Sequence, residues 1–443
     1  MNVNDKLFDT PARTATRRGF LAASAAGSMA VALPAVLGAE KEKKYKTALV
    51  GSGWWGMNIL KTALAAGRSR VAGICDIDRN QIDPAAEEIE KLTGTAPEKY
   101  PDYREMLDKE KPEIVIVATP DHWHALCTIA ALESGAHVYV EKPISHTILE
   151  GSAMVKAARD ADRAVQVGTH RRASPHNMSA MRFLREGKAG KISMVRAFVH
   201  YPGGPGTSEP DSDPPEGLDW DFWCGPAPLV PFNTRLHPKG FRYFSDFANG
   251  MLGDWGIHWM DQILWWTEET HPKTVYSTGA KHVMVDNSDM PDTQVATFEF
   301  DSFTATWEHR RCAGAHAEKH NIGVCFYGTE GTVHLGWLDG WTFYPRNSGQ
   351  KEIHEEPQLH DPDKQNIPEL WADFLSAIGS GRRPICDIEV GHRSTTMSLL
   401  GMLSLKLGRS VRWDGENERI LDDPEANALL RRDYRAPWVY PQA

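Results

Sequence analysis

Short apolar runs alternate with amphipathic stretches between about Lys46 and Gly168. The runs are almost continuously apolar, which is typical of strands that are buried on both faces of a sheet. The predicted strands are Thr47–Val50, Arg70–Asp76, Ile114–Ala118, His137–Val140 and Ala164–Gly168. The helices predicted between them are Met57–Ala66, Ala85–Leu92, His124–Ser134 and Leu149–Ala161. This alternation predicts a parallel sheet covered by helices, with ligands bound beyond the carboxyl ends of the strands.

The spacing changes after about Ile192 to an alternation of apolar and polar residues with a period of two. Such alternation predicts an antiparallel sheet with one face buried and the other facing solvent or a partner. The predicted strands are Ile192–Tyr201, Gln294–Phe300, Phe303–Arg310 and Thr332–Leu335. A loop rich in proline and glycine is expected from Pro202 to about Gly240, and helices are expected at Asp254–Trp266, Ile367–Ile378 and Gly391–Leu407. We expect the last of these helices to pack back on the first domain.

A glycine-rich turn, Gly51-Ser52-Gly53-Trp54-Trp55-Gly56, joins the first predicted strand to the first predicted helix. Gly51 allows a tight turn, Gly53 lets the backbone approach a pyrophosphate, and Gly56 lets the helix pack closely on the strand. The helix N-terminus would then offer free N–H groups and the positive end of its dipole to the phosphates. Placed between a strand and a helix, this pattern predicts a dinucleotide-binding Rossmann domain.

An acidic residue, Asp76, ends the second predicted strand about 20 residues beyond the turn. Its carboxylate is expected to accept hydrogen bonds from the ribose hydroxyls of the adenosine. A carboxylate would also repel a 2′-phosphate, so we expect NAD as the cofactor and consider NADP disfavoured. Arg79 lies nearby and would favour NADP instead, because an arginine could bind the 2′-phosphate.

The N-terminus carries a separate pattern. Thr16-Arg17-Arg18-Gly19-Phe20-Leu21 is a twin-arginine sequence, and the small-residue apolar stretch Ala22–Leu37 follows it. We therefore predict that residues 1–39 are a Tat-type signal peptide that directs the protein to the periplasm. The apolar stretch is short and contains Pro34, which argues against a stable membrane span. Because the Tat pathway carries folded proteins and nicotinamide cofactors are made in the cytoplasm, NAD is expected to be loaded before export and held tightly.

Composition limits the number of domains, the class of ligand and the state of the cysteines. The chain has 443 residues, 41% of them hydrophobic and 24% charged, which is enough for two globular domains after the signal. We expect a Rossmann NAD-binding domain at residues 45–168 and a substrate and oligomerisation domain at residues 169–443. The formal net charge of −10 disfavours nucleic-acid binding. The six cysteines form no CxxC pair, which favours buried thiols, although an exported chain could oxidise a pair.

Three loops are expected to meet at the carboxyl edge of the parallel sheet: Gly51–Gly56, Thr119–His124 and Glu141–Pro143. Lys142 would there reach the point where a substrate oxygen meets the nicotinamide. A solvated surface lysine is the alternative, but the position beside two other cofactor loops favours a functional role. His122 and His124 in the second loop are spaced like a metal pair. They diverge at a helix start and lack a third ligand, so we assign no metal site.

A second group of polar residues lies in the helix predicted near residue 254. Asp254 and His258 are four residues apart and would share one helix face. A carboxylate beside an imidazole orients the ring and raises its proton affinity, which suits a general base. The alternative is that Asp254 caps the helix and His258 is an ordinary core residue, and from this motif alone the alternative would be favoured.

Taken together, these motifs resemble those of the Gfo/Idh/MocA family, the glucose–fructose and inositol dehydrogenase-like oxidoreductases. The matching residues are the Gly51–Gly56 turn, Asp76, Ala118-Thr119-Pro120-Asp121-His122-Trp123-His124, Glu141-Lys142-Pro143 and Gly253-Asp254-x-Gly256-x-His258. The resemblance implies an α/β fold with an N-terminal Rossmann domain and a C-terminal α/β domain built on a large, mainly antiparallel sheet. It also implies that Lys142, Asp254 and His258 form the catalytic group, and that the protein is a homo-dimer or homo-tetramer.

We assign the cofactor site to the three loops and Asp76. Its predicted residues are Gly51, Gly53, Trp54, Trp55, Gly56, Asp76, Thr119, Pro120, His122, Trp123, His124, Glu141 and Lys142. The resemblance places Trp123 near the nicotinamide. The candidates for substrate contacts are His170, Arg171, Arg172 and Trp255. The first three follow a strand end, where charged residues could equally mark a helix start at the surface.

Three functions are compatible with these residues. The first is an exported NAD(H)-dependent oxidoreductase acting on a sugar, sugar derivative or cyclitol: His258, oriented by Asp254, takes a hydroxyl proton while Lys142 stabilises the charge on the same oxygen. The second is an NAD-dependent glycosidase. The export signal and the residues at positions 121–124 and 168–172 also resemble those of NAD-dependent glycosidases such as the α-N-acetylgalactosaminidases. The third is a non-catalytic sugar sensor, against which the three intact catalytic residues argue.

Overall fold

Six parallel strands form the first sheet of the computed structural model, which describes residues 43–312, 318–361 and 363–442. The predicted Tat signal peptide lies outside the described residues. The strands are β1 (Tyr45–Val50), β2 (Ser69–Cys75), β3 (Glu98–Tyr100), β4 (Ile114–Val117), β5 (His137–Val140) and β6 (Val165–Val167), in the order β3-β2-β1-β4-β5-β6. All four residues of β4 are completely buried, as expected for a strand that is covered on both faces. The prediction of a Rossmann-type parallel sheet is therefore confirmed.

Five helices connect these strands. They are α1 (Trp54–Ala65), α2 (Arg79–Thr93), α3 (Tyr103–Glu110), α4 (Asp121–Glu133) and α5 (Ile148–Asp160). Local sequence explains their ends: Asp78 caps α2 by accepting a hydrogen bond from the N–H of Asn80, and Gly94 ends it in the left-handed conformation. Helix α4 starts at Asp121, three residues before the predicted start. The side chains of residues 121–123 therefore project from its first turn, beside the carboxyl edge of the sheet.

The second sheet has ten strands. They are β7 (Ile192–His200), β8 (Thr274–Ala280), β9 (Thr293–Glu299), β10 (Thr304–Arg310), β11 (Ile322–Gly328), β12 (Gly331–Gly336), β13 (Trp341–Pro345), β14 (Ile353–Glu355), β15 (Val411–Asp414) and β16 (Arg419–Ile420). Their order is β14-β13-β12-β11-β7-β10-β9-β8-β15-β16, and only the β7–β10 pair is parallel. The predicted large, mainly antiparallel sheet is thus confirmed. Side chains along β9 alternate between buried and exposed, which matches the period of two in its sequence.

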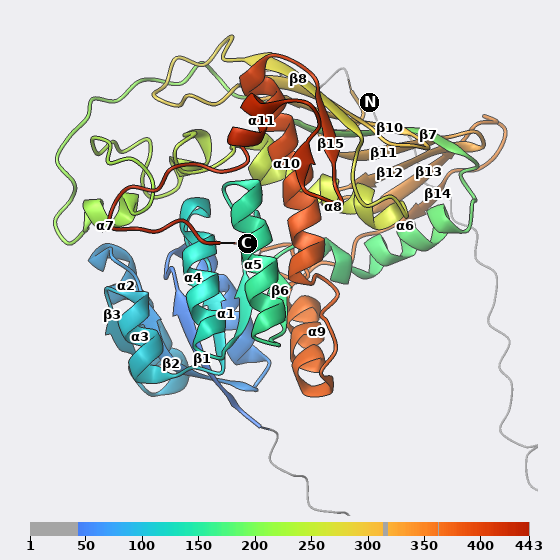
Figure 1. The fold of residues 1–443 in the computed structure, drawn as a ribbon. Helices are drawn as coiled ribbons and strands as arrows, with labels where there is room; N and C mark the ends of the chain where they lie inside the picture. Colours follow the sequence, from blue (N-terminus) through green and yellow to red (C-terminus); the bar gives the residue numbers. More distant parts are fainter. Residues whose placement is uncertain (1–42, 313–317, 362, 443) are drawn as a thin grey trace, which may run out of the picture. The chain divides into compact units, whose positions relative to one another are not determined.

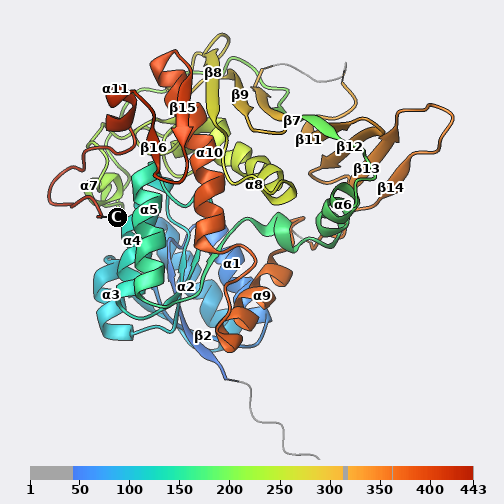
Figure 2. The same ribbon diagram turned by 45° about the vertical axis from the view of Figure 1, so that its right-hand side comes forward.

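Helices cover one face of this large sheet (Figure 1). They are α6 (Pro175–Arg185), α8 (Ile257–Trp266) and the long α10 (Ile388–Leu407), which contact strands β12, β7 and β8 respectively. Figures 1 and 2 both show α10 beside α5, so the last long helix packs against the Rossmann domain. Residues of α9 (Ile367–Ser380) join the hydrophobic core of the parallel sheet as well. The chain therefore returns to its first domain after completing most of the second.

The expected loop between β7 and α8 contains more structure than its sequence predicted. It includes the short helices α7 (Trp220–Cys224) and η2 (Gly240–Tyr243), and it has a small hydrophobic core of its own around Trp220, Trp223 and Phe241. We call residues 217–247 the strap. The chain ends beyond α11 (Pro424–Ala428) in a tail, residues 429–442, that lies against the strap.

The described residues also bear on membrane spans and on cysteine pairing. None of their helices combines the length and apolar character needed to cross a bilayer. All six cysteines lie among these residues and none of them is paired; Cys75, Cys127, Cys224 and Cys386 are buried.

Candidate active site

A cavity of about 640 Å³ lies at the carboxyl edge of the parallel sheet. Its walls come from the three predicted loops, the strap, the start of α8 and the connection between β12 and β13. The predicted site residues on its wall are Gly51, Gly53, Trp54, Trp55, Gly56, Asp76, Thr119, Pro120, Trp123, His124, Glu141, Lys142, His170, Asp254, Trp255 and His258. Residues from distant parts of the sequence thus meet at one cavity, at the place where a Rossmann sheet binds its ligand.

The glycine turn has the shape that a dinucleotide requires. Gly51 has a φ of +90°, and a Cβ at this residue would lie 2.6 Å from the carbonyl oxygen of Ala118. A Cβ at Gly56 would lie 2.0 Å from the carbonyl oxygen of Gly51. Within the described part of the chain no side chain caps the N-terminus of α1, and the first turn of this helix holds no acidic residue. The first N–H groups of α1 are therefore free to bind a pyrophosphate, and the residues present fit NAD.

Asp76 is held at the end of β2, on the cavity wall. One carboxylate oxygen accepts hydrogen bonds from the N–H (2.8 Å) and hydroxyl (3.1 Å) of Ser52, and the other accepts one from the N–H of Asp78 (3.1 Å). Burial raises the pKa of Asp76 to about 6, against the effect of these hydrogen bonds, so the group is mostly ionised at pH 7. Arg79 is exposed and lies outside the cavity lining, with its side-chain stem against Gly217.

At the other end of the cavity, Lys142 forms an ion pair with Asp254. Lys142 Nζ donates hydrogen bonds to Asp254 Oδ1 at 2.8 Å and to the Asp254 carbonyl oxygen at 2.9 Å. Arg242 Nε donates to the same Oδ1 at 3.3 Å. Burial would raise the pKa of Asp254, but Lys142 and Arg242 outweigh that effect and hold it below its usual value. One carboxylate therefore positions two cationic side chains on the cavity wall.

This pairing corrects the expected role of Asp254. The residue lies in a π-helical turn, η3 (Leu252–Gly256), that leads into α8, and its carboxylate is occupied by Lys142 and Arg242. It makes no hydrogen bond to His258 among the described residues. Burial, followed by the charges of Lys142 and Arg171, holds the pKa of His258 well below its usual value. The hypothesis that Asp254 raises the proton affinity of His258 is therefore wrong, because burial and the two nearby cations favour the neutral imidazole.

Aromatic rings surround His258. Its ring centroid lies 5.3 Å from that of His170 and 4.9 Å from that of Trp337, and Trp337 in turn lies 4.9 Å from Trp255. Trp337 comes from the connection between β12 and β13, and no motif in the sequence pointed to it. Its strands are far from the Gly253–His258 motif in sequence, so only the pairing of the large sheet brings the indole to the cavity.

Three predicted site residues lie off the cavity wall. Arg172 is buried in an ion pair with Asp261, whose carboxylate oxygens are both 2.9 Å from Arg172 Nε. Arg171 is buried with its guanidinium carbon 3.8 Å from the ring centroid of Trp337. His122 faces the strap, with Nε2 3.0 Å from the Trp223 carbonyl oxygen. The two arginines therefore support the wall of the cavity from behind, and His122 supports the strap.

His124 joins two of the cofactor loops. Its Nδ1 lies 2.7 Å from the carbonyl oxygen of Pro143, and its Nε2 lies 2.8 Å from that of Thr119. Glu141 is buried beneath the same loops, and burial raises its pKa. The side chains of the HxH pair thus bind different carbonyl groups and point to different elements.

The strap supplies cavity residues that sequence patterns did not select. His237, Lys239, Phe241 and Arg242 all line the cavity. Asp121, in the first turn of α4, also lines it, and burial raises its pKa to about 7. The strap residues lie in a stretch without helical or strand periodicity, so no local pattern distinguished them from a surface loop.

Three family profiles match the chain. The profile described as the oxidoreductase family, NAD-binding Rossmann fold, matches residues 45–169. The GFO/IDH/MocA C-terminal domain matches residues 178–334, and the oxidoreductase family C-terminal alpha/beta domain matches residues 345–440. The matches cover both sheets.

Curated relatives are similar to part of the chain. Levoglucosan dehydrogenase from Pseudarthrobacter phenanthrenivorans is 33% identical over 159 residues, which are 35% of this chain and 39% of that protein. Glycosyl hydrolase family 109 protein 1 from Akkermansia muciniphila is 28% identical over 168 residues, which are 37% of this chain and 35% of that protein. The matched stretches thus span well under half of each relative's own length.

Solved structures share the fold over most of the chain. A levoglucosan dehydrogenase in complex with NADH and levoglucosan has a TM-score of 0.66 at 19% identity, and the match covers 84% of this chain and 99% of that chain. The WlbA dehydrogenase from Bordetella pertussis, in complex with NADH and UDP-GlcNAcA, has a TM-score of 0.62 at 19% identity, with the same coverage. The profile matches over both domains and the dinucleotide-shaped turn lead to one conclusion: the chain belongs to the Gfo/Idh/MocA oxidoreductase family and carries its NAD-binding Rossmann domain.

Proposed function

We propose that this protein is an exported NAD(H)-dependent oxidoreductase that acts on a CH–OH group of a sugar, sugar derivative or cyclitol. The observation that carries the proposal is the arrangement of Lys142, Asp254 and His258 on one cavity with the dinucleotide turn. The indoles of Trp255 and Trp337 beside His258 offer flat apolar faces, which suit the apolar face of a sugar ring.

Each residue has a defined task in the proposed reaction. Bound NAD supplies the hydride acceptor. His258 accepts the hydroxyl proton, and we assign this step to Nε2 because Nδ1 is fully buried. Lys142 donates a hydrogen bond to the same oxygen and stabilises the negative charge that develops there. Asp254 holds the Lys142 ammonium in position by its hydrogen bond at 2.8 Å.

The substrate class rests on the relatives. A curated relative is a levoglucosan dehydrogenase, and the fold is shared with a WlbA dehydrogenase that was solved with a nucleotide sugar. The test is product analysis of the purified protein with a panel of free sugars, glycosides and cyclitols. A keto product supports the proposal, whereas the absence of any product from the whole panel would contradict it.

An NAD-dependent glycosidase is the second candidate, because family 109 glycosyl hydrolases match the same part of the chain. In that cycle a ring hydroxyl is oxidised, the neighbouring C–H becomes acidic, and the glycosidic bond breaks by elimination. Water would then add, and the ketone would be reduced again by the hydride that the bound cofactor would supply, so the cofactor would be unchanged overall. Release of an aglycone without a keto product would favour this candidate. A sugar sensor would bind sugar and release nothing.

We also propose that the protein is exported to the periplasm by the Tat pathway with its cofactor already bound. The support is the twin-arginine sequence at residues 16–21 ahead of an NAD-binding domain. The test is to denature protein purified from the periplasm and to assay the supernatant for nicotinamide nucleotide. Much less than one nucleotide per chain, with activity restored by added NAD, would contradict loading before export.

Binding should favour NAD over NADP. The Asp76 carboxylate is fixed by Ser52 and Asp78 where it would face a 2′-phosphate, and Arg79 lies outside the cavity lining. We expect NAD to bind at least about 10-fold more tightly, because a close charge repulsion costs more than about 1.4 kcal/mol. Titration of the cofactor-free protein with both nucleotides measures this ratio, and Asp76→Asn should reduce it. Equal affinities in the wild type would show that Asp76 does not select the cofactor.

We expect a homo-dimer or homo-tetramer built on the large sheet. Its face opposite the helices exposes Met194, Tyr276 and Val295 on β7, β8 and β9. Light scattering at micromolar concentration should give the mass of a dimer or tetramer, and Val295→Arg should shift it towards the monomer. Leu92→Arg is the matched control, since Leu92 is an exposed apolar residue in α2 of the other domain. A monomeric wild type would contradict the prediction.

A further inference from the structure

One segment of the strap, His237 to Arg242, lines the cavity and contacts Asp78 and Trp54 of the Rossmann domain and Asp254 of the catalytic group. We propose that this segment is the second half of the NAD site and that the C-terminal tail locks it shut. NAD would then leave only when the strap opens. The proposal rests on NAD binding, which the family establishes, and is independent of the sugar chemistry.

The strap is attached at the ribose end of the site. His237 Nε2 lies 3.0 Å from Asp78 Oδ2, and the N–H of Asp78 donates to Asp76 Oδ1 at 3.1 Å. Asp78 and Leu218 also form an antiparallel bridge, and the N–H of Arg79 donates to the Gly217 carbonyl oxygen at 2.9 Å. The acidic residue expected to bind the ribose is thus connected to the strap through one buried aspartate.

A cation of the strap stands near the pyrophosphate position. Lys239 Nζ lies 5.2 Å from the ring centroid of Trp54, the first residue of α1. Over residues 43–312, 318–361 and 363–442, no carboxylate lies within ion-pair distance of Lys239. An ammonium without a carboxylate partner, next to the uncapped N-terminus of α1, is positioned to neutralise a pyrophosphate.

At the catalytic end, the strap contributes Arg242. Its Nε donates to Asp254 Oδ1, the oxygen that also accepts from Lys142. The strap is therefore bonded to both ends of the cofactor site, to residues of α2 at one end and of η3 at the other. Opening it would break these contacts together.

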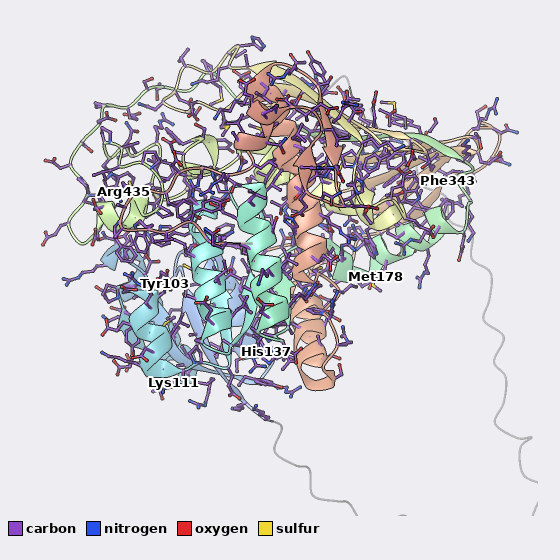
Figure 3. All side chains as sticks on the ribbon, viewed as in Figure 1. Tyr103, Lys111, His137, Met178, Phe343 and Arg435 are labelled. Atoms are coloured by element: carbon purple, nitrogen blue, oxygen red, sulfur yellow. The ribbon has the colours of Figure 1, made fainter. Side chains whose placement is uncertain are left out.

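The tail holds the strap from outside. Arg435 Nη1 lies 2.9 Å from Asp221 Oδ2, Nη2 donates to the Asp221 carbonyl oxygen at 2.7 Å, and Nε donates to the Gly225 carbonyl oxygen at 3.1 Å. Figure 3 shows Arg435 at the short helix of the strap, well away from Lys111 and His137 at the opposite edge of the parallel sheet. Beneath that helix, Trp123 Nε1 donates to the Trp223 carbonyl oxygen at 2.9 Å. Arg435 thus joins the tail to the strap above the first turn of α4, which carries Trp123. Two other tail residues also contact the strap: Arg432 Nη1 donates to the Asp246 carbonyl oxygen at 2.9 Å, and Trp438 packs on Phe222.

The test is the rate at which the holoenzyme releases NADH. Protein loaded with NADH is mixed with excess NAD, and the loss of bound-NADH fluorescence gives the dissociation rate. We expect Lys239→Gln and Arg435→Ala each to raise this rate by about 10-fold or more, since each loses a charge-assisted contact. The effect of Lys239→Gln should shrink between about 0.05 M and 0.5 M salt, because an exposed charge is screened.

Two matched controls distinguish an effect on strap opening from a general loss of protein stability. Lys188→Gln removes an exposed lysine outside the cavity. Arg431→Ala removes a tail arginine that stacks on Tyr440 and makes no side-chain hydrogen bond or ion pair with any residue that the structure describes. Both should release NADH at the wild-type rate. If Arg435→Ala does not fold, Asp221→Asn weakens the same contact from the strap side. Wild-type release rates in both Lys239→Gln and the Arg435 or Asp221 variant would overturn the proposal, whatever the protein does with sugars.

Discussion

Replacing His258 with alanine is expected to lower kcat by about 10²–10⁴-fold while the fold and the bound cofactor remain. The imidazole lies on the cavity wall, and burial near Lys142 and Arg171 keeps its pKa well below the usual value. These surroundings favour the neutral imidazole, the form that can accept a proton, and alanine offers no replacement. The measurements are turnover with the best sugar of the panel, the amount of bound NAD and the melting temperature. The oxidation step is common to the dehydrogenase and glycosidase cycles, so the result applies to both.

The matched control is His176→Ala. His176 is a fully buried histidine in α6 and lies outside the cavity lining. Its loss should lower the melting temperature and leave turnover close to that of the wild type. If His258→Ala also kept its turnover and lost only stability, His258 would be a packing residue, and another group would have to accept the proton.

Lys142→Met is expected to lower kcat by about 10²–10³-fold, with a smaller effect on KM. Its ammonium is aimed at the cavity by Asp254 and would stabilise charge that appears mainly in the transition state. Methionine keeps much of the length of the side chain but cannot donate a hydrogen bond. Asp254→Asn should be milder, because an amide oxygen can still accept a hydrogen bond from Lys142 Nζ. Steady-state kinetics on the three proteins measures the split between kcat and KM.

Lys46→Met provides a comparison in which a partly buried ion pair is lost and the proposed catalytic residues are retained. Lys46 pairs with Glu110 at 2.9 Å on the first sheet and lies outside the cavity lining. We expect a lower melting temperature and normal turnover. Equal turnover in Lys142→Met and the wild type would remove Lys142 from the mechanism and leave it as a structural partner of Asp254.

Much of the fold follows from patterns of neighbouring residues. The run at Ile114–Val117 is apolar throughout, and the run at His137–Val140 is apolar after its partly buried histidine. Both strands are buried on both faces, and the sequence therefore reveals them directly. Strand β3 was not among the predicted elements, because its residues Glu98-Lys99-Tyr100 are short and largely polar. Strands β8 and β11 and the short helices of the strap were also missed. No local spacing marked these elements, although β8 and β11 each pair with the next strand along the chain, β9 and β12.

The sequence by itself determined the dinucleotide turn and the place of Lys142 at the end of β5. Both depend on a few consecutive residues in a strand–loop unit, whose geometry is local. The tertiary structure alone decided that Asp254 pairs with Lys142 and Arg242 instead of His258, and that Arg171 and Arg172 lie behind the wall of the cavity. It alone brought Trp337 and Lys239 to the cavity. The physical reason is that a carboxylate binds the cations that lie nearest to it in space. Lys142 comes from the edge of the parallel sheet and Arg242 from the strap, and the spacing of residues along one helix carries no information about either.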